Sequence, residues 1–429
     1  ENKIRPRLDP TRRLVELLGD PQKIYRIIHV TGTNGKTSTT RFIERLLREH
    51  GLRTGRFTSP HLVTLNERLS IDGEPVSDEA LVAAWEDIAP IVEIVDAELA
   101  AADEGPLTFF EVLAVLGFAV FADAPVDVLV LEVGMGGEWD STNVADGDVA
   151  VFAPISLDHM DRLGNTIEEI AQTKAGIIKS GAFVVSSAQP AEALAVLTDK
   201  ASATADAFKS YGADFEVLES TPDILGQKVS IRTLAGEYAD LNLPVHGYYQ
   251  AENAALAIAA VEAFLGGGEQ RIMDDVVLAA FADFSSPGRL QVVSREPLVI
   301  LDAAHNPGGA ESLVQALKTN FGSPYVIAVI SILADKDARG LLEALDSSVV
   351  EVIITQSSSA RAIPADKLAE LAREVFGDDR VKVQANPQWA LAEATLALPE
   401  GQKSAILVTG SITLVGEVLA LKQIEAEQD

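Results

Sequence analysis

The chain repeats one pattern along most of its length, in which a short and almost entirely apolar segment is followed by a stretch with helical periodicity. Eight apolar segments have the length of a strand, at residues 23–30, 127–133, 149–155, 182–187, 297–302, 325–331, 349–355 and 404–410. Strands that are apolar on both faces are typical of parallel sheets covered by helices on each side. The sequence therefore predicts an α/β protein with mostly parallel sheets.

The chain is expected to form two domains, because 429 residues exceed what one hydrophobic core usually serves. The segment FSSPGR at 284–289 has the Ser, Pro and Gly content of a linker. We predict an N-terminal domain at 1–285 and a smaller, Rossmann-like C-terminal domain at 286–429. Shorter alternating segments at 205–245 predict a small antiparallel subsheet in the first domain.

Charge and composition restrict the possible partners. The formal net charge is −30, and a field of that sign repels nucleic acids and anionic membrane surfaces. The longest apolar run, at 112–122, is too short to span a bilayer, and the N-terminus lacks the layout of a signal peptide. The absence of cysteine excludes disulfides and fits a reducing cytoplasm. We expect a cytoplasmic protein that binds neither nucleic acid nor membranes.

The segment HVTGTNGKTSTT at 29–40 has the composition of a phosphate-binding loop that opens a helix. Gly32 and Gly35 permit backbone conformations in which N–H groups converge on an anion, and the helix N-terminus adds partial positive charge. Lys36 can reach the terminal phosphates, and Thr37 can approach a phosphate oxygen or magnesium. The predicted helix buries a stripe formed by Phe42, Ile43, Leu46 and Leu47, and it stops at Gly51. The match is to a short form of the motif, because Val30 occupies the position of its usual first glycine.

Three polar residues follow predicted strands at their carboxyl ends, where open α/β sheets place their sites. Glu132 closes the apolar run DVLVLE, Ser59 closes the short run GRFTS, and His159 follows VAVFAPISLD. A glutamate so deep in apolar sequence needs a partner, and magnesium is a suitable one. An isolated histidine is more often structural, but the shared position favours a metal role for Glu132 and His159.

Lys174 belongs to a predicted helix at 165–179, which begins with Thr166 and Glu169 in the spacing of a capping box. Its apolar face holds Ile167, Ile170, Lys174, Ile177 and Ile178. Burial there would lower the pKa of the Lys174 amine, which could then capture carbon dioxide as an oxygen-tipped carbamate suited to a hard cation. The alternative is a lysine whose amine extends past the stripe into water.

Nine motifs in order along nearly the whole chain resemble the folylpolyglutamate synthase and dihydrofolate synthase family of the Mur ligase superfamily. They are TGTNGKTS, TSPHL with NER, TFFE, LEVGMGGEWDSTN, LDHMDRLG, TKAGIIK, SSPGR, LDAAHNPGGA and LADKD. The resemblance implies that ATP phosphorylates a carboxylate of dihydropteroate or of a folate, and that L-glutamate attacks the acyl phosphate. The products would be an amide, ADP and phosphate. It also implies two magnesium sites and a monomer.

The resemblance also implies roles for particular residues. It places the ATP phosphates against Thr33, Asn34, Gly35, Lys36 and Thr37, and further nucleotide contacts at Asn253, Arg289, Asp302 and His305. It implies that Ser59, Glu132 and His159 ligate the first magnesium and that Lys174, as a carbamate, ligates the second. The residues expected to carry catalysis are Lys36, Glu132, His159 and Lys174. Closure of the two domains would exclude water from the acyl phosphate.

The pterin substrate is expected against two segments that resemble the dihydropteroate pocket of bifunctional members. They comprise Thr108, Phe109, Phe110 and Glu111, together with Trp139, Asp140 and Ser141. Planar pterins favour aromatic walls, although Phe109 and Phe110 could equally be core residues of an apolar helix. Glu138 stands where many members carry arginine, which changes how an anionic substrate would be held.

Several functions remain open from the sequence. The favoured one is a bifunctional ligase, and the alternatives are a monofunctional folylpolyglutamate synthase or a ligase acting on a cell-wall precursor. A nucleotide-dependent switch is a third class, because DRLG at 161–164 fits a D-x-x-G pattern. Against it, the chain has no N-K-x-D tetrapeptide for reading guanine, and a switch would leave the second domain unexplained.

Overall fold

The computed structural model describes residues 6–223, 225–322 and 324–428. They form two compact units. The first contains the chain as far as Glu219, with Ser230–Leu241 and Glu252–Asp283; the second contains Ser220–Val229, Asn242–Ala251 and the chain from Phe284 onward. Each unit has its own large sheet.

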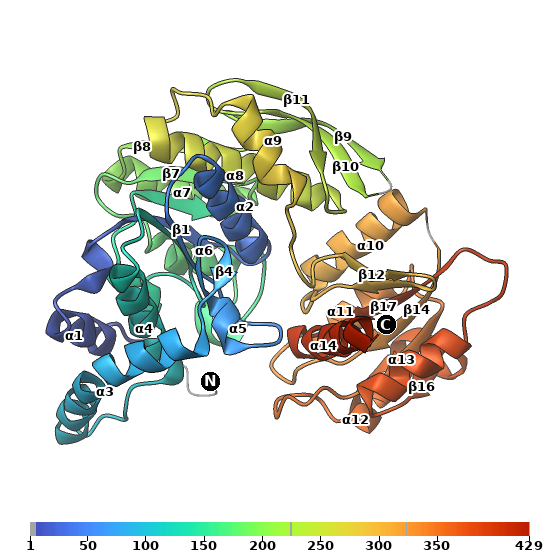
Figure 1. Cartoon of the computed structure of the whole chain (residues 1–429). Helices are drawn as coiled ribbons and strands as arrows, with labels where there is room; N and C mark the ends of the chain where they lie inside the picture. The colour runs from blue at the N-terminus through green and yellow to red at the C-terminus, as the bar shows by residue number, and fades with distance from the viewer. Residues whose placement is uncertain (1–5, 224, 323, 429) are drawn as a thin grey trace. The chain divides into compact units, whose positions relative to one another are not determined.

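The first unit is built on an eight-stranded sheet with the order β4-β3-β2-β5-β1-β6-β7-β8. Figure 1 labels four of these strands, β1, β4, β7 and β8. Its strands are β1 (Arg26–Thr31), β2 (Thr54–Phe57), β3 (Leu69–Ile71), β4 (Glu74–Pro75), β5 (Val128–Glu132), β6 (Val149–Phe152), β7 (Phe183–Ser186) and β8 (Ala207–Ser210). The strands from β2 to β8 in this order run parallel, while β3 and β4 continue the sheet in antiparallel pairs. The sheet is therefore mostly parallel, with the antiparallel strands β3 and β4 at one edge.

Helices surround this sheet because its strands are buried on both faces. They are α1 (Asp9–Leu17), α2 (Lys36–Glu49), α3 (Asp78–Ala101), α4 (Phe109–Asp123), α5 (Met160–Leu163), α6 (Ile167–Ala175), α7 (Ala191–Thr204), α8 (Tyr248–Gly266) and α9 (Asp274–Ala282), with 3₁₀ turns η1 (Pro21–Lys23), η2 (Leu65–Arg68) and η3 (Ser141–Val144). Leu129 and Leu131 of β5 pack with α1, α3 and α4. Val128 and Val130, also without exposed surface, point to the opposite face because side chains alternate along a strand.

The second unit contains a six-stranded sheet with the order β12-β13-β17-β14-β15-β16. Its strands are β12 (Gln291–Arg295), β13 (Leu298–Leu301), β14 (Tyr325–Ile330), β15 (Glu351–Ile354), β16 (Val381–Val383) and β17 (Ser404–Thr409). Only β12 is antiparallel to its neighbour among these described pairs. The accompanying helices are α10 (Pro307–Phe321), α11 (Ala338–Leu345), α12 (Ala365–Phe376), α13 (Pro387–Leu396) and α14 (Ile412–Gln428), with the turn η4 (Asp378–Arg380).

The region predicted as one antiparallel subsheet divides between two sheets. Strand β8, at the start of that region, extends the large sheet by pairing parallel to β7. Strands β9 (Glu216–Asp223), β10 (Gly226–Arg232) and β11 (Glu237–Leu243) form a separate three-stranded sheet. The prediction was wrong for β8 because four half-buried residues carry too little pattern to show which neighbour they pair with.

All eight predicted apolar strands are present, but the helix predicted at 165–179 is shorter than expected. It has the predicted capping box at Thr166 and Glu169, and it ends at Ala175. A side chain on Gly176 would come within 2.4 Å of the Glu138 Cα, so this close approach needs glycine. Ile177 and Ile178 follow the helix and are still buried.

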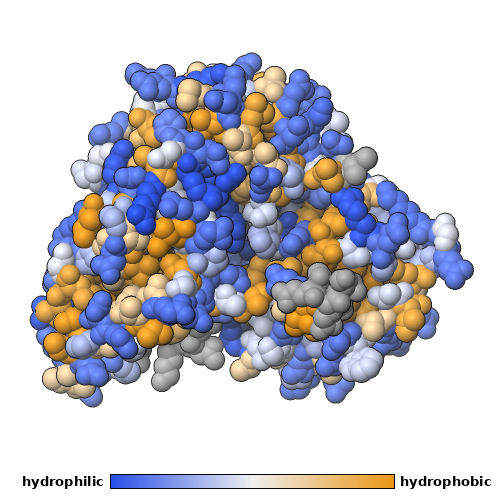
Figure 2. Space-filling view, in the orientation of Figure 1, coloured by the Kyte–Doolittle hydropathy of each residue, from blue (hydrophilic) through white to orange (hydrophobic). Residues whose placement is uncertain are grey.

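No helix in the part of the chain that the structure describes is long and apolar enough to cross a membrane. The apolar run at 112–122 lies inside α4, whose 15 residues pack into the core of the first unit. Figure 2 shows hydrophilic residues over much of the visible face, with hydrophobic residues in smaller areas among them. Such scattered apolar surface is ordinary for a folded protein.

Candidate active site

The loop between β1 and α2 has the form of an anion cradle. Gly32 and Gly35 both have positive φ angles, of 147° and 84°. A side chain on Gly32 would lie 2.7 Å from the Ala153 Cβ, and one on Gly35 would lie 2.6 Å from the Asn253 Oδ1. Both glycines are therefore required by conformation and by space. The loop leads into the N-terminus of α2, where backbone N–H groups favour negative charge.

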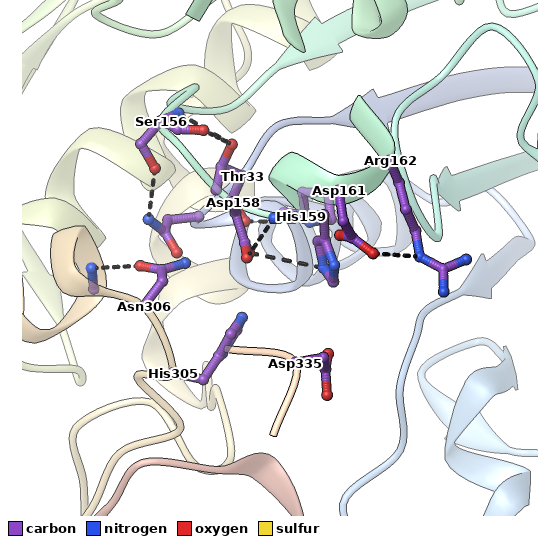
Figure 3. A network of polar contacts seen from close by, with 12 residues as sticks. Thr33, Ser156, Asp158, His159, Asp161, Arg162, His305, Asn306 and Asp335 are labelled. Carbon is purple, nitrogen blue, oxygen red and sulfur yellow. Dashed lines mark hydrogen bonds and ion pairs between the residues drawn. The ribbon is translucent and has the colours of Figure 1, made fainter. Parts of the chain in front are cut away.

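The loop is held in place by the segment that follows β6. The backbone N–H groups of Thr33 and Asn34 donate to the Pro154 carbonyl at 2.8 and 3.3 Å. Thr33 Oγ1 donates to the Ser156 carbonyl and accepts from the Ser156 N–H, both at 3.0 Å (Figure 3). Sequence reasoning missed Pro154 and Ser156, although the residues directly after a parallel strand were the place to look. The cradle is thus ordered by the sheet itself.

Two lysines converge on a single carbonyl oxygen of this loop. Lys36, the first residue of α2, donates from Nζ to the carbonyls of Gly32 at 3.1 Å and Thr33 at 3.3 Å. Lys174 donates from Nζ to the same Gly32 oxygen at 2.8 Å. The two ammonium groups are therefore close enough to repel each other.

The environment of Lys174 confirms the prediction of a desolvated amine. The residue is 3% exposed, and burial, followed by repulsion from Lys36, lowers the pKa of its amine to about 7. Its hydrogen bond to Gly32 excludes the alternative in which the amine extends into water. A large fraction of the amine is neutral and nucleophilic near neutral pH.

Two oxygen ligands of the kind that magnesium prefers stand together beside the cradle. Glu132, at the end of β5, is 1% exposed and accepts a hydrogen bond of 2.9 Å from Thr37 Oγ1. The strands bring them together, because Val30 and Glu132 are paired in register and the loop follows β1 directly. The carboxylate and the hydroxyl fit a hard cation bound next to phosphates.

Ser59 and His159 have less defined positions as magnesium ligands. Ser59 is half-buried just after β2, and His159 precedes α5 with a φ of 50°. The His159 Nε2 lies 3.8 Å from Asp158 Oδ2 (Figure 3). Among the described residues no three His, Cys, Asp or Glu side chains gather as a metal site. The predicted ligand set contains only two such residues, so it stays a prediction.

Asn253 lies against the cradle within the first unit. It is 4% exposed on α8, and its Oδ1 is 3.4 Å from Thr39 Oγ1 on α2. The close approach of Gly35 to the same Oδ1 places the amide directly behind the loop. Its predicted contact with the nucleotide stays a prediction.

The other predicted nucleotide residues belong to the second unit, where they organise one loop. The buried Asp302 accepts from the backbone N–H groups of Leu290 and Ala304, both at 2.8 Å, and its burial raises the pKa of its carboxyl. Arg289 Nη1 and His305 Nδ1 lie 3.4 and 2.9 Å from the Ala303 carbonyl. Asn306 then caps α10 by accepting from the Gly309 N–H at 2.8 Å. These bonds establish a structural role, and the nucleotide role stays a prediction.

Two residues of the TFFE motif cap the N-terminus of helix α4. Thr108 and Glu111 form a reciprocal capping box at the start of α4. The Glu111 carboxylate also accepts from Arg7 Nε and Nη2 at 2.9 and 3.1 Å. The spacing T-x-x-E signals such a box, and sequence reasoning missed it here. Phe109 is 41% exposed, and Phe110 packs edge to face on Phe57 at 6.1 Å.

Replacing Glu111 by glutamine is expected to lower the free energy of unfolding by about 1–2 kcal/mol, because it weakens the cap and removes the buried carboxylate that the half-buried Arg7 grips with two hydrogen bonds. Urea denaturation measures the change. The matched control is Glu98→Gln. Glu98 also accepts two hydrogen bonds from one arginine, Arg13, but this pair is exposed, so the free energy of unfolding should change little. Equal effects in the two variants would contradict a special structural role for Glu111.

The second predicted pterin segment is internally bonded. The buried Asp140 accepts from Met135 N at 2.8 Å, Thr142 N at 3.0 Å and Thr142 Oγ1 at 2.6 Å. Thr142 Oγ1 in turn lies 3.0 Å from Nε2 of His29. Burial lowers the pKa of the His29 imidazole to about 3. Ser141 is buried and Trp139 packs on the core near α6. The carboxylate of Asp140 therefore shapes the glycine loop after β5.

The comparisons with known proteins agree with this geometry. The chain matches the model of the Mur ligase middle domain over residues 77–261 and that of the Mur ligase, glutamate ligase domain over residues 288–412. With the phosphate cradle, these matches define an ATP-dependent ligase of the Mur type. A Mycobacterium tuberculosis protein named dihydrofolate synthase/folylpolyglutamate synthase is 42% identical over 98% of this chain and 91% of its own length. The chain belongs to the dihydrofolate synthase/folylpolyglutamate synthase family.

Solved structures extend the similarity to the whole fold. The M. tuberculosis folylpolyglutamate synthase complexed with ADP has a TM-score of 0.93 at 42% identity and covers 98% of this chain and 95% of its own. Escherichia coli FolC in complex with DHPP and ADP has a TM-score of 0.86 at 29% identity and covers 100% of this chain and 96% of its own. The predicted fold class and family are thus confirmed.

Proposed function

We propose that this chain uses ATP to join L-glutamate to the carboxylate of dihydropteroate and to folates, through an acyl phosphate. The observation that carries the proposal is the cradle with Lys36, Thr37 and Glu132 assembled around it. Relatives solved with ADP support ATP as the co-substrate, and the relative solved with both DHPP and ADP supports a pterin acceptor. In the reaction an oxygen of the acceptor carboxylate takes the γ-phosphoryl group from ATP. The glutamate amine then forms the amide and displaces phosphate.

The residues of the cradle position the phosphoryl group and neutralise its charge. Lys36 starts from a pair of loop carbonyls and can move its ammonium group to the phosphate oxygens by rotating its side chain. Glu132 and Thr37 would hold magnesium, with Ser59 and His159 as further proposed ligands. Magnesium, when bound, stabilises charge on the transferring phosphoryl group. The chain itself supplies no nucleophile for this step, because the carboxylate and the amine both come from substrates.

We assign a second magnesium to Lys174 as a carbamate. The amine sits beside the cradle, and its lowered pKa keeps a reactive fraction neutral near pH 7. The amine nitrogen would bond to the carbon of carbon dioxide and release a proton, which leaves an anionic carbamate. That product would supply the oxygen ligands that an amine lacks.

Further assignments are parts of the same proposal. We assign the ATP-binding domain to 1–285 and the C-terminal ligase domain to 286–429, and nucleotide contacts to Asn253, Arg289, Asp302 and His305. We assign the pterin ring to Phe109, Phe110 and Trp139, with Thr108, Glu111, Asp140 and Ser141 shaping these segments through their hydrogen bonds. A monomer in the cytoplasm completes the proposal.

The test is ADP release with ATP, magnesium and glutamate, comparing dihydropteroate with tetrahydrofolate as acceptor. Turnover with both is the expected result. Turnover with tetrahydrofolate alone would indicate a monofunctional folylpolyglutamate synthase. A Lacticaseibacillus casei relative that is 36% identical over 96% of this chain is named folylpolyglutamate synthase, which supports this alternative. No glutamate-dependent turnover with either acceptor would refute the proposal.

A further inference from the structure

One arginine on α2 differs from its neighbours in having no hydrogen-bond or ion-pair partner for its side chain among the described residues. Arg45 pairs with Glu49 at 2.8 Å, and Arg48 donates to the Asp72 carbonyl at 2.7 Å. The half-buried Arg41 has neither a hydrogen bond nor an ion pair with any residue in the described ranges. An arginine carries five N–H donors, and those of Arg41 are left for water or a ligand.

The position of Arg41 directs it towards the cradle. It follows Thr37 by four residues, so the two side chains lie on the same side of α2. Helical side chains tilt towards the N-terminus of their helix, which here is the end that carries Lys36 and the glycine loop. Thr37 contacts Glu132, and the charge of Glu132 acts on Arg41 as well.

The acidic groups around Arg41 are already engaged by other donors. Glu67 accepts from the backbone N–H groups of Leu62, Val63 and Thr64, all at 2.8 Å. Glu44 accepts from Thr54 Oγ1 at 2.7 Å and from Arg56 Nη1 at 3.2 Å. These carboxylates attract Arg41 electrostatically without bonding to it.

The charge of Arg41 is retained in this environment. Burial, followed by repulsion from Arg56, lowers the pKa of the guanidinium to about 9, while Glu67, Glu44 and Glu132 oppose the decrease. A value of about 9 leaves the group protonated at neutral pH. Arg41 therefore offers a charged guanidinium with unused donors to an anionic ligand.

We propose that Arg41 binds the carboxylate oxygens of the acceptor substrate, an assignment that rests on the ligase function proposed above. The planar guanidinium matches a carboxylate in a two-bond fork, which a lysine cannot reproduce. Lys36 and Lys174 gather at the Gly32 carbonyl, next to the proposed phosphate position. The electrostatic neighbours of Arg41 instead include Glu67 in η2, the turn that follows β2 by way of Ser59. The acceptor carboxylate has to lie next to the γ-phosphate, and Arg41 would hold it there.

The experiment compares dihydropteroate with its carboxamide, which lacks the negative charge, by calorimetric titration in the presence of ADP and magnesium. The wild-type chain should bind the carboxylate roughly 30-fold more tightly than the amide. Arg41→Gln should reduce this preference to about threefold or less, and Arg41→Lys should give an intermediate value because it keeps charge without the fork. The affinity for ADP should stay within about twofold in every variant.

The matched control is Arg45→Gln, on the same helix but paired with Glu49, which should keep the full preference. Thermal unfolding verifies that each variant is folded, and Arg41→Lys alone decides the question if the glutamine variant does not fold. A preference unchanged in the Arg41 variants would overturn the proposal, as would an equal loss of ADP affinity. Absence of wild-type turnover counts against the ligase function instead, so the two failures are distinguishable.

Discussion

Replacing Lys36 by alanine should lower kcat for ADP formation by at least about 1,000-fold, because phosphoryl transfer depends on positioning and charge neutralisation. The side chain donates to carbonyl oxygens of its own loop and belongs to no hydrophobic cluster among the described residues. The midpoint of thermal unfolding should therefore change little. Steady-state ADP release and thermal unfolding on the same preparation give both quantities.

The control for this variant is Lys23→Ala, which removes an exposed lysine that pairs with Asp20 before β1. Its turnover should equal that of the unmodified chain. A Lys36→Ala protein with near-normal turnover would show that the cradle does not serve the transferred phosphate. A loss of turnover accompanied by unfolding would show that Lys36 is structural, which is contrary to the proposal.

Lys174 should carry a carbamate, visible by native mass spectrometry as about 44 Da of additional mass at neutral or alkaline pH and lost on acidification. The expected pH dependence follows from the lowered pKa of about 7. Above that pH the amine is mostly neutral and reacts with carbon dioxide; below it the amine is protonated and does not. Activity should therefore rise as the pH increases through about 7, and added bicarbonate should increase it most near that pH.

Substitution tests the same assignment. Lys174→Ala should lower turnover by about 100-fold or more, and short carboxylic acids should restore part of it by occupying the place of the carbamate. Lys179 is the matched control, since its Nζ lies 3.7 Å from Asp146 Oδ1, whose charge favours the protonated amine, and it should stay unmodified. An unmodified Lys174 in a fully active protein would refute the carbamate.

The strands and the cradle could be predicted because their causes are local in sequence. Near-continuous apolar runs define buried strands, and the TGTNGKT segment contains both glycines that the loop conformation requires. The burial of Lys174 also followed from its neighbours on a short helix. In each case a few adjacent residues held the whole signal.

Other features depended on pairs that are distant in sequence. The fork between Arg7 and Glu111 joins residues 104 positions apart, and the support of Thr33 by Ser156 joins residues 123 positions apart. Neither pair has a pattern within one segment. The same limit applies to Arg41. Its lack of a bonded carboxylate could be recognised only in the structure, where the neighbouring Glu67 and Glu44 accept hydrogen bonds from other donors.

The hydrogen bonds from Thr33 and Asn34 to Pro154 also have a thermodynamic consequence. A loop that is ordered by the sheet has already lost its backbone freedom during folding, so the nucleotide need not supply that entropy when it binds. Nucleotide affinity then depends on the local stability of the carboxyl end of β6, which the ligand does not have to touch. Loosening that end should accelerate ADP release, while the chemistry of the phosphate contacts stays the same.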